Sequence, residues 1–283
     1  FLTRNNLMLV SRIFRSRQKR IASFSLALGQ DSVLGIFGLP AQPASVTPHC
    51  LPIEAGANAP ARAVTSALRA MFDTGGDSTV ANLVLSSRYC RYLSLPWSDA
   101  LLDRPASANY LRQAFVDAYG DGAADWYIVI PDTPYGQTVV ACAVERAVLD
   151  QVRDTSLASR LSNVRPYFSA AYELFRKEID AANAVFAVVE ENLMTVGRIC
   201  ERSVVEVDVL SAGEAWPAVL VAWLSRTALL EGEPGPVFVA CPPAWRGSAP
   251  QETGADWRFL EWPEPVRELV ATNPALALAA CLQ

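Results

Sequence analysis

Few residues of this 283-residue chain combine the type and the spacing that catalysis or metal binding requires. The single histidine, His49, lies in a proline-rich segment, and no Gly-x-Ser-x-Gly motif offers a serine nucleophile for it to activate. No CxxC, HxxxH or HExxH motif is present, and neighbouring cysteines are at least 40 residues apart. We therefore expect neither a hydrolase triad nor a metal site.

Two consecutive acidic residues, Glu190 and Glu191, stand at the end of an apolar run without basic neighbours. Successive residues of a strand point to opposite faces, so these carboxylates act together only if a turn begins there. Asp132 also follows an apolar run, but Pro134 and Gly136 favour an ordinary turn. The TGGDST segment lacks the lysine of a phosphate-binding P-loop and ends a helical pattern instead of opening one.

The composition predicts a folded acidic protein, with 51% hydrophobic residues and a net charge of -5. An acidic body repels a phosphate backbone, so we expect no nucleic-acid partner. The longest apolar runs, such as AVFAVV and AWPAVLVAWL, are shorter than the roughly 20 residues of a transmembrane helix. Four cysteines in apolar stretches are expected to be buried thiols in a reducing compartment: Cys90, Cys142, Cys200 and Cys241.

Residues 1–20 form a basic leader that contains six basic residues and no acidic one. Apolar residues between positions 7 and 14 could form one side of a short helix, and such a helix suits anionic lipid headgroups. The candidate membrane-surface residues are Arg12, Arg15, Arg17, Lys19 and Arg20. The alternative is a solvated terminus without a membrane role.

Apolar periodicity predicts a mixed α/β chain. The first half should begin with a hairpin at 22–39, an edge strand at 49–53 and a helix at 61–72. We then expect a second hairpin made of VANLVLS and YCRYLSLPW, a helix that ends at Gly120, and two strands around PDTPYGQ. A helix ERAVLDQVRDT, a strand LSNVRPY and a helix FSAAYELFRKEID follow. The second half should contain three strands at 185–210, a helix WPAVLVAWLSRTALLEG and a doubly covered parallel strand PVFVACP. A proline-rich loop and a last helix NPALALAAC should follow. We expect the three tryptophans of this loop to pack onto the protein: Trp245, Trp257 and Trp262.

The two halves repeat one β-β-β-α-β plan, which is the plan of the actin-like, ribonuclease H-type fold. We therefore expect an α/β protein with a first actin-like domain at 21–165 and a second at 166–283, after the leader at 1–20. In this fold the two domains face a cleft, and the turns of the two opening hairpins hold nucleotide phosphates.

Several segments resemble PilM-type and GspL-type proteins of inner-membrane assembly platforms. VVACAVERAVLDQV followed by LSNVRPYFSAAYELF is similar to their strand-helix-strand-proline-helix segment, and AVFAVVEENLMTVGRICERSVVEVDVL to the meander that opens their second domain. YCRYLSLPWSDAL resembles the MSHA-type (MshI-like) relatives of PilM, and the basic leader before the first strand looks like theirs. The resemblance covers most of residues 8–283.

The first phosphate turn departs from this family. The resemblance implies an Asp-x-Gly turn with a nearby lysine, because glycine lets the backbone approach a phosphate and the carboxylate organises Mg²⁺. This chain keeps Gly29 but has Ala27 at the Asp position and Leu34 where a lysine could reach the phosphates. Asp31 could replace the lost carboxylate, although a turn residue is the simpler interpretation.

The second phosphate turn departs in the same way, since it offers only Glu190, Glu191 and Asn192 and no glycine before Gly197. We therefore expect no catalytic residue and no cofactor, with ATP and Mg²⁺ as the alternative. Gly29 and Asp31, with Glu190 and Glu191, mark the two degenerate phosphate turns.

The resemblance implies a catalytically silent scaffold of a type IV pilus or type II secretion-like platform, cytoplasmic and peripheral on the inner membrane. Its partner would be the cytoplasmic tail of a bitopic inner-membrane protein, bound in a groove of the first domain, and an assembly ATPase could dock on it as on GspL-type proteins. Two alternatives remain open: an ATP-binding or hydrolysing member of the actin superfamily, including sugar-kinase-like enzymes, and an unrelated α/β interaction domain.

Overall fold

The protein's structure, a computed structural model, is mixed α/β with three sheets. It describes residues 23–28, 32–38, 48–53, 62–67, 69–70, 80–153, 161–212, 215–232, 235–248, 255–263, 267–268 and 270. The predicted final helix NPALALAAC and the basic leader lie outside these residues.

The first sheet is built around the predicted opening hairpin. Its strands lie in the order β3 (Pro48–Pro52), β2 (Ser32–Gly38), β1 (Ser23–Leu28), β4 (Val80–Leu85) and β8 (Leu161–Pro166). β1 and β2 pair antiparallel, whereas β4 runs parallel to β1 and β8 parallel to β4. The predicted edge strand at 49–53 is confirmed as β3, and its prolines are tolerated because an edge strand leaves one side unpaired.

The second sheet repeats this order. Its strands are β11 (Ser203–Ser211), β10 (Leu193–Cys200), β9 (Ala184–Val189), β12 (Val237–Ala240) and β13 (Trp257–Phe259). A helical segment at 62–67 and 69–70 precedes β4, and α5 (Trp216–Glu231) precedes β12. The duplicated β-β-β-α-β plan is confirmed. β12 is buried along its whole length, as predicted for a doubly covered parallel strand, and so is its neighbour β9.

A third, antiparallel sheet was not foreseen. It consists of β5 (Cys90–Leu95), β7 (Val139–Val144) and β6 (Tyr127–Val129), and α2 (Arg104–Tyr119) packs on it through Leu111 and Phe115. The prediction that VANLVLS and YCRYLSLPW pair as a hairpin is therefore wrong. β4 takes a central position beside β1, and the short helix η1 (Ser87–Tyr89) then directs β5 into the other sheet.

The remaining described elements follow the sequence pattern more closely. Gly120 ends α2 with a φ of 86°, as predicted. The other helices and short 3-10 turns are α3 (Arg146–Arg153), α4 (Tyr167–Phe175), η2 (Asp99–Leu102), η3 (Asp121–Asp125) and η6 (Pro243–Ser248). Within the described residues, no helix combines the length and apolar character needed to cross a membrane.

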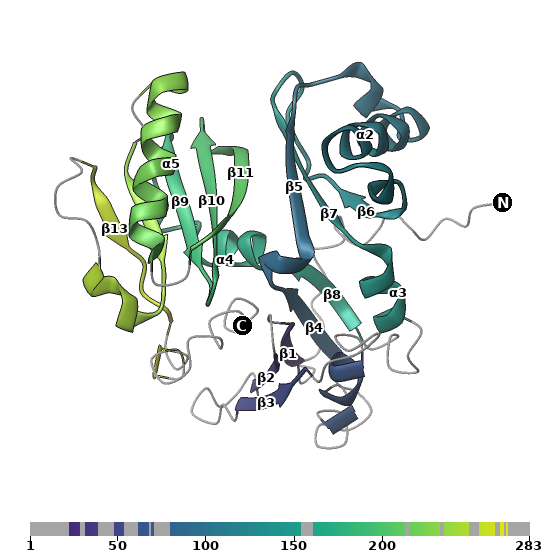
Figure 1. The fold of residues 1–283 in the computed structure, drawn as a ribbon, viewed down its shortest axis with the longest axis vertical. Coiled ribbons are helices and arrows are strands. Elements are labelled where there is room, and N and C mark those ends of the chain that lie inside the picture. The colour runs from purple at the N-terminus through teal and green to yellow at the C-terminus, as the bar shows by residue number, and fades with distance from the viewer. Residues whose placement is uncertain are drawn as a thin grey trace.

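The three sheets form two lobes that lie side by side, with α4 between them (Figure 1). The N-terminal lobe, residues 23–166, contains the first and third sheets, and the C-terminal lobe, residues 184–263, contains the second. One hydrophobic core runs through both lobes, since Leu83, Phe168, Phe186 and Trp262 belong to the same buried cluster. The division at residue 165 into independent domains stays a prediction.

The tryptophans of the C-terminal segment pack onto the protein, as expected. Trp262 is fully buried with its ring centroid 5.2 Å from that of Phe175, and Trp257 lies 6.3 Å from the buried Trp216. The segment that contains these tryptophans was predicted to be a loop. Its residues 257–259 instead form the short strand β13, which pairs with β12.

Candidate functional site

The carboxyl ends of central strands from both lobes meet at one point. In the first sheet the amide of Ser86, the residue after β4, donates to the carbonyl of Leu28 at the end of β1, with a distance of 2.9 Å. In the second sheet the amide of Glu190, the residue after β9, donates to the carbonyl of Leu193 at 2.7 Å and closes the turn into β10. Because β1 and β9 open the two halves, this is the place where the sequence predicts the phosphate turns.

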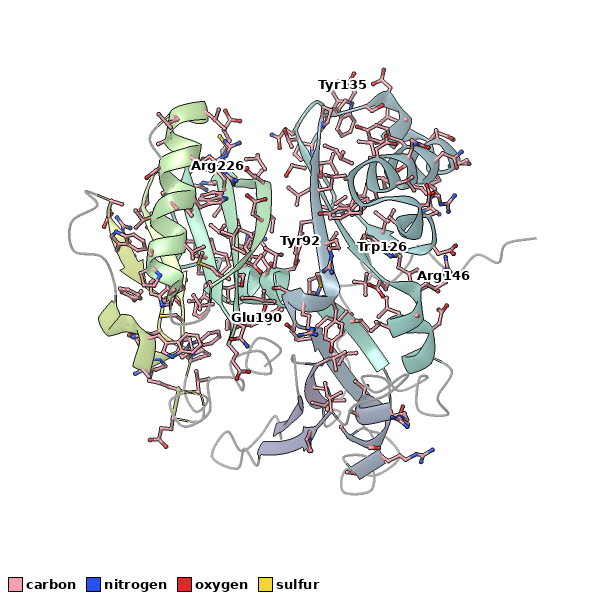
Figure 2. The ribbon with its side chains drawn as sticks, in the orientation of Figure 1. Tyr92, Trp126, Tyr135, Arg146, Glu190 and Arg226 are labelled. Atoms are coloured by element: carbon pink, nitrogen blue, oxygen red, sulfur yellow. The ribbon has the colours of Figure 1, made fainter. Side chains whose placement is uncertain are left out.

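A buried polar network joins the two lobes here, around Glu190, which is labelled in Figure 2. The Ser86 hydroxyl donates to Oε2 of Glu190, and the backbone amide of Ser87 donates to Oε1 at 3.0 Å. On β10, Oγ1 of Thr195 donates to the hydroxyl of Ser87 at 2.6 Å. The exposed fractions of Ser86, Ser87 and Thr195 are 0%, and that of Glu190 is 4%. We call these four residues the inter-lobe network.

Burial raises the pKa of Glu190 above its ordinary value of 4.5, while the hydrogen bonds from Ser86 and Ser87 oppose this shift. No ion pair between described residues includes Glu190. Its ionisable neighbours are Cys90, whose pKa is raised by its hydrogen bond with Cys142 and by burial, and Tyr92, whose pKa is raised by burial. Within the described residues, the carboxylate of Glu190 is therefore stabilised by hydrogen bonds.

The hydrogen-bond donors of this site are used within the protein. The Ser86 hydroxyl and the Ser87 amide are the kind of donors that could bind a phosphate at a strand end, but both donate to the protein's own carboxylate. The site lacks exposure to solvent, and Ser86 has no histidine within the network to activate it. The arrangement can hold two chain segments together.

The structure separates the two predicted acidic residues. Glu190 is buried in the network, whereas Glu191 is exposed. Ala27 and Leu34 are direct cross-strand partners near the end of the first hairpin, and Gly29 and Asp31 lie outside the described residues.

The other candidate residues from the sequence are not part of the inter-lobe network. Asp132 is exposed in the turn between β6 and β7, where Gly136 has a φ of 79°. The candidate membrane-surface residues all lie outside the described residues: Arg12, Arg15, Arg17, Lys19 and Arg20. In the part of the chain that the structure describes, no group of three or more His, Cys, Asp or Glu side chains is arranged to hold a metal ion.

Three members of the network were missed in the sequence. Ser86 and Ser87 are two polar residues directly after an apolar strand, and that position was a usable signal. Thr195 gave none, because it looks like an ordinary strand residue. The buried cysteines were predicted correctly at Cys90, Cys142 and Cys241, whereas Cys200 is half-buried.

The chain is similar to known proteins in structure. No protein-family model matches the sequence, and no curated protein matches it. The cytoplasmic domain of EpsL, an inner-membrane component of the type II secretion system of Vibrio cholerae, superposes with a TM-score of 0.57 and 16% identity over 90% of this chain and 94% of that one. A PilM-PilN type IV pilus biogenesis complex matches with a TM-score of 0.62 and 12% identity over 93% and 98% of the two chains.

A third similar structure is described as having an actin-like fold. A Bacteroides thetaiotaomicron protein with an actin-like ATPase fold and unknown function has a TM-score of 0.57 and 9% identity, over 91% of this chain and 96% of that one. The predicted actin-like fold is therefore confirmed. This chain has an actin-like fold of the kind found in the EpsL cytoplasmic domain and in PilM.

Proposed function

We propose that this chain is a catalytically silent, actin-like scaffold of a type IV pilus or type II secretion-like inner-membrane platform, and that it binds the cytoplasmic tail of a bitopic membrane partner. The near-complete overlap with the EpsL cytoplasmic domain and with PilM in a PilM-PilN complex supports a role in this group of assemblies. This role places the chain in the cytoplasm, peripheral to the inner membrane. An assembly ATPase is a second partner compatible with it.

The proposed lack of nucleotide binding and catalysis depends on one observation, the hydrogen-bonded carboxylate of Glu190. An actin-like fold binds nucleotide phosphates between the turns of its two opening hairpins, and here that region contains a buried acid which takes the donors of Ser86 and Ser87. A phosphate would have to displace these bonds and then face a carboxylate. Electrostatic repulsion and lost hydrogen bonds both oppose nucleotide binding.

An extended tail needs a sheet edge, and β6 is one candidate in the N-terminal lobe. Among the described strands β6 pairs only with β7, and Val129 on it is 38% exposed. Tyr127 at its start is fixed by a 2.6 Å hydrogen bond to Asp150 and by the guanidinium of Arg146, 4.4 Å from the ring centroid. A rigid, half-exposed edge strand of this kind can accept a peptide by backbone pairing.

Two of the other edges of this lobe, β5 and β3, are less suitable. β5 lies beside β11 of the other lobe, and the Tyr119 hydroxyl donates to the carbonyl of Tyr92 on it at 2.8 Å. β3 begins and ends with proline, which cannot donate a ladder hydrogen bond.

The test is titration of the full chain with peptides made from the cytoplasmic tails of membrane proteins encoded beside it. We expect micromolar affinity for one tail, and a marked loss of affinity for Val129→Lys, because a charge on the edge strand opposes pairing. Leu230→Lys is the matched control, since it adds the same charge at a side chain of α5 that is 76% exposed in the other lobe. Tail binding weaker than about 1 mM, a free energy of about -4 kcal/mol, contradicts the proposal.

A further inference from the structure

The inter-lobe network links segments that are far apart in the chain. Its bonds join residues separated by 104, 103 and 108 positions. Ser86 and Ser87 follow β4 of the first sheet, whereas Glu190 and Thr195 stand on either side of the β9-β10 turn of the second sheet. The network is therefore a contact between lobes and not a local turn.

Next to the inter-lobe network, aromatic side chains also pack between the two lobes. The ring of Phe168, on α4, lies 6.2 Å from the ring of Tyr92 on β5 and 5.4 Å from that of Phe186 on β9. A Cβ at Gly197 on β10 would come within 2.4 Å of this ring, so any other residue there requires the ring to shift. Apolar packing resists separation but is not directional, whereas the hydrogen bonds require one relative orientation.

Opening the lobes at this point carries a specific penalty. Rotation or separation removes the acceptor of a buried hydroxyl and of a buried amide at the same time, and it leaves the carboxylate without donors until water enters. Figure 2 shows Glu190 between the lobes, with Tyr135 and Arg226 toward the far ends of the two lobes. A small rotation at Glu190 therefore displaces the ends of the lobes most.

We infer that Glu190, Ser86, Ser87 and Thr195 form an internal clasp that fixes the orientation of the two lobes without a nucleotide. In a fold whose cleft holds a ligand between two hairpin turns, this clasp replaces the ligand as the element that sets lobe orientation. The inference goes beyond the scaffold role, and it does not depend on tail binding or on the site of the tail.

Distance measurements between the lobes test the clasp directly. Spin labels attached to p-acetylphenylalanine at Leu102 and Leu229, which are 68% and 88% exposed, leave the six native cysteines unmodified. We expect one narrow inter-label distance in the full chain, unchanged by Mg-ATP. Glu190→Ala should broaden and shift this distance, whereas Glu191→Ala, at the exposed neighbouring residue, should leave it as in the unmodified sequence.

Two further variants keep the test decisive. Glu190→Gln preserves an acceptor for the Ser87 amide and should keep the narrow distance. If Glu190→Ala does not fold, as judged by circular dichroism, Ser86→Ala removes one bond of the clasp and should broaden the distance by itself. A narrow, unshifted distance in a folded Glu190→Ala or Ser86→Ala protein overturns the clasp, as does a broad distance in the unmodified protein. Failure of tail binding overturns the proposed function instead, so the two results are distinguishable.

Discussion

Ser86 donates a hydrogen bond to Glu190 across the junction of the two lobes, although the two residues lie 104 positions apart in the chain. One follows a central strand of the first sheet and the other a central strand of the second. Glu190 lies in the predicted second phosphate turn, and the amide of Ser86 donates to the carbonyl of Leu28, the last residue of β1 before the predicted first one. This bond therefore connects the fold to the proposed loss of nucleotide chemistry.

Glu190→Ala is expected to lower the free energy of unfolding by about 2 kcal/mol, since it leaves a buried hydroxyl and a buried amide without their acceptor. Glu191→Ala should change it by less than about 0.5 kcal/mol, as expected for an exposed residue. Urea denaturation at one pH measures both values. Equal stabilities of the two variants would mean that the network contributes nothing.

The stability contributed by Glu190 should depend on pH in a defined direction. Its folded pKa is raised above 4.5 by burial, so the folded protein holds the proton more tightly than the unfolded chain. This contribution is fully present below pH 4.5 and is lost as the pH rises through the raised pKa. The groups that face it are Ser86 and Ser87, with Cys90 and Tyr92 nearby.

Glu190→Gln removes this titration and serves as the reference. The free energy of unfolding of the unmodified protein, minus that of Glu190→Gln, should therefore fall as the pH rises from acidic values toward neutrality. Urea denaturation of both proteins across this range gives the difference. A difference that stays constant, or rises with pH, contradicts a raised pKa.

Gly197→Ala should destabilise the protein by about 1–3 kcal/mol, because the added Cβ meets the Phe168 ring at 2.4 Å and this ring is buried between other aromatic side chains. Gly122→Ala is the matched control, since a Cβ there meets no atom within 4 Å. Thermal unfolding followed by circular dichroism compares the two. A tolerated Gly197→Ala would show that the lobes can repack at this contact.

Deletion of residues 1–20 should reduce co-sedimentation of the chain with anionic liposomes. Each basic residue near such a surface contributes about 1 kcal/mol before screening, so binding should also fall with added salt. Neutral liposomes provide the control. Equal binding of the full and shortened chains to anionic liposomes would rule out a membrane role of the leader.

Local pattern predicted much of the fold. Alternation marked the opening hairpin and the meander at 185–210, and Gly120 marked the end of α2. It failed at 80–95, where two apolar runs with a short polar connection look like a hairpin but enter different sheets. Apolar periodicity identifies a strand, but it does not predict which strand pairs with it, because this pairing depends on contacts between residues distant in sequence.

The candidate site was predicted only in part, for the same reason. Glu190 was recognised as an acid at a strand end, but its role depends on Ser86, which only the folded chain brings near it. β13 was missed because three residues in a proline-rich segment give no periodic signal.

Calorimetric titration of the full chain with Mg-ATP is the most direct test of the silent scaffold, because Glu190 and its hydrogen-bond donors occupy the region of the predicted second phosphate turn. We predict no binding heat up to about 1 mM nucleotide and no phosphate release above that of buffer. A micromolar dissociation constant for Mg-ATP, or measurable turnover, would contradict the silent scaffold and identify an ATP-binding member of the actin superfamily.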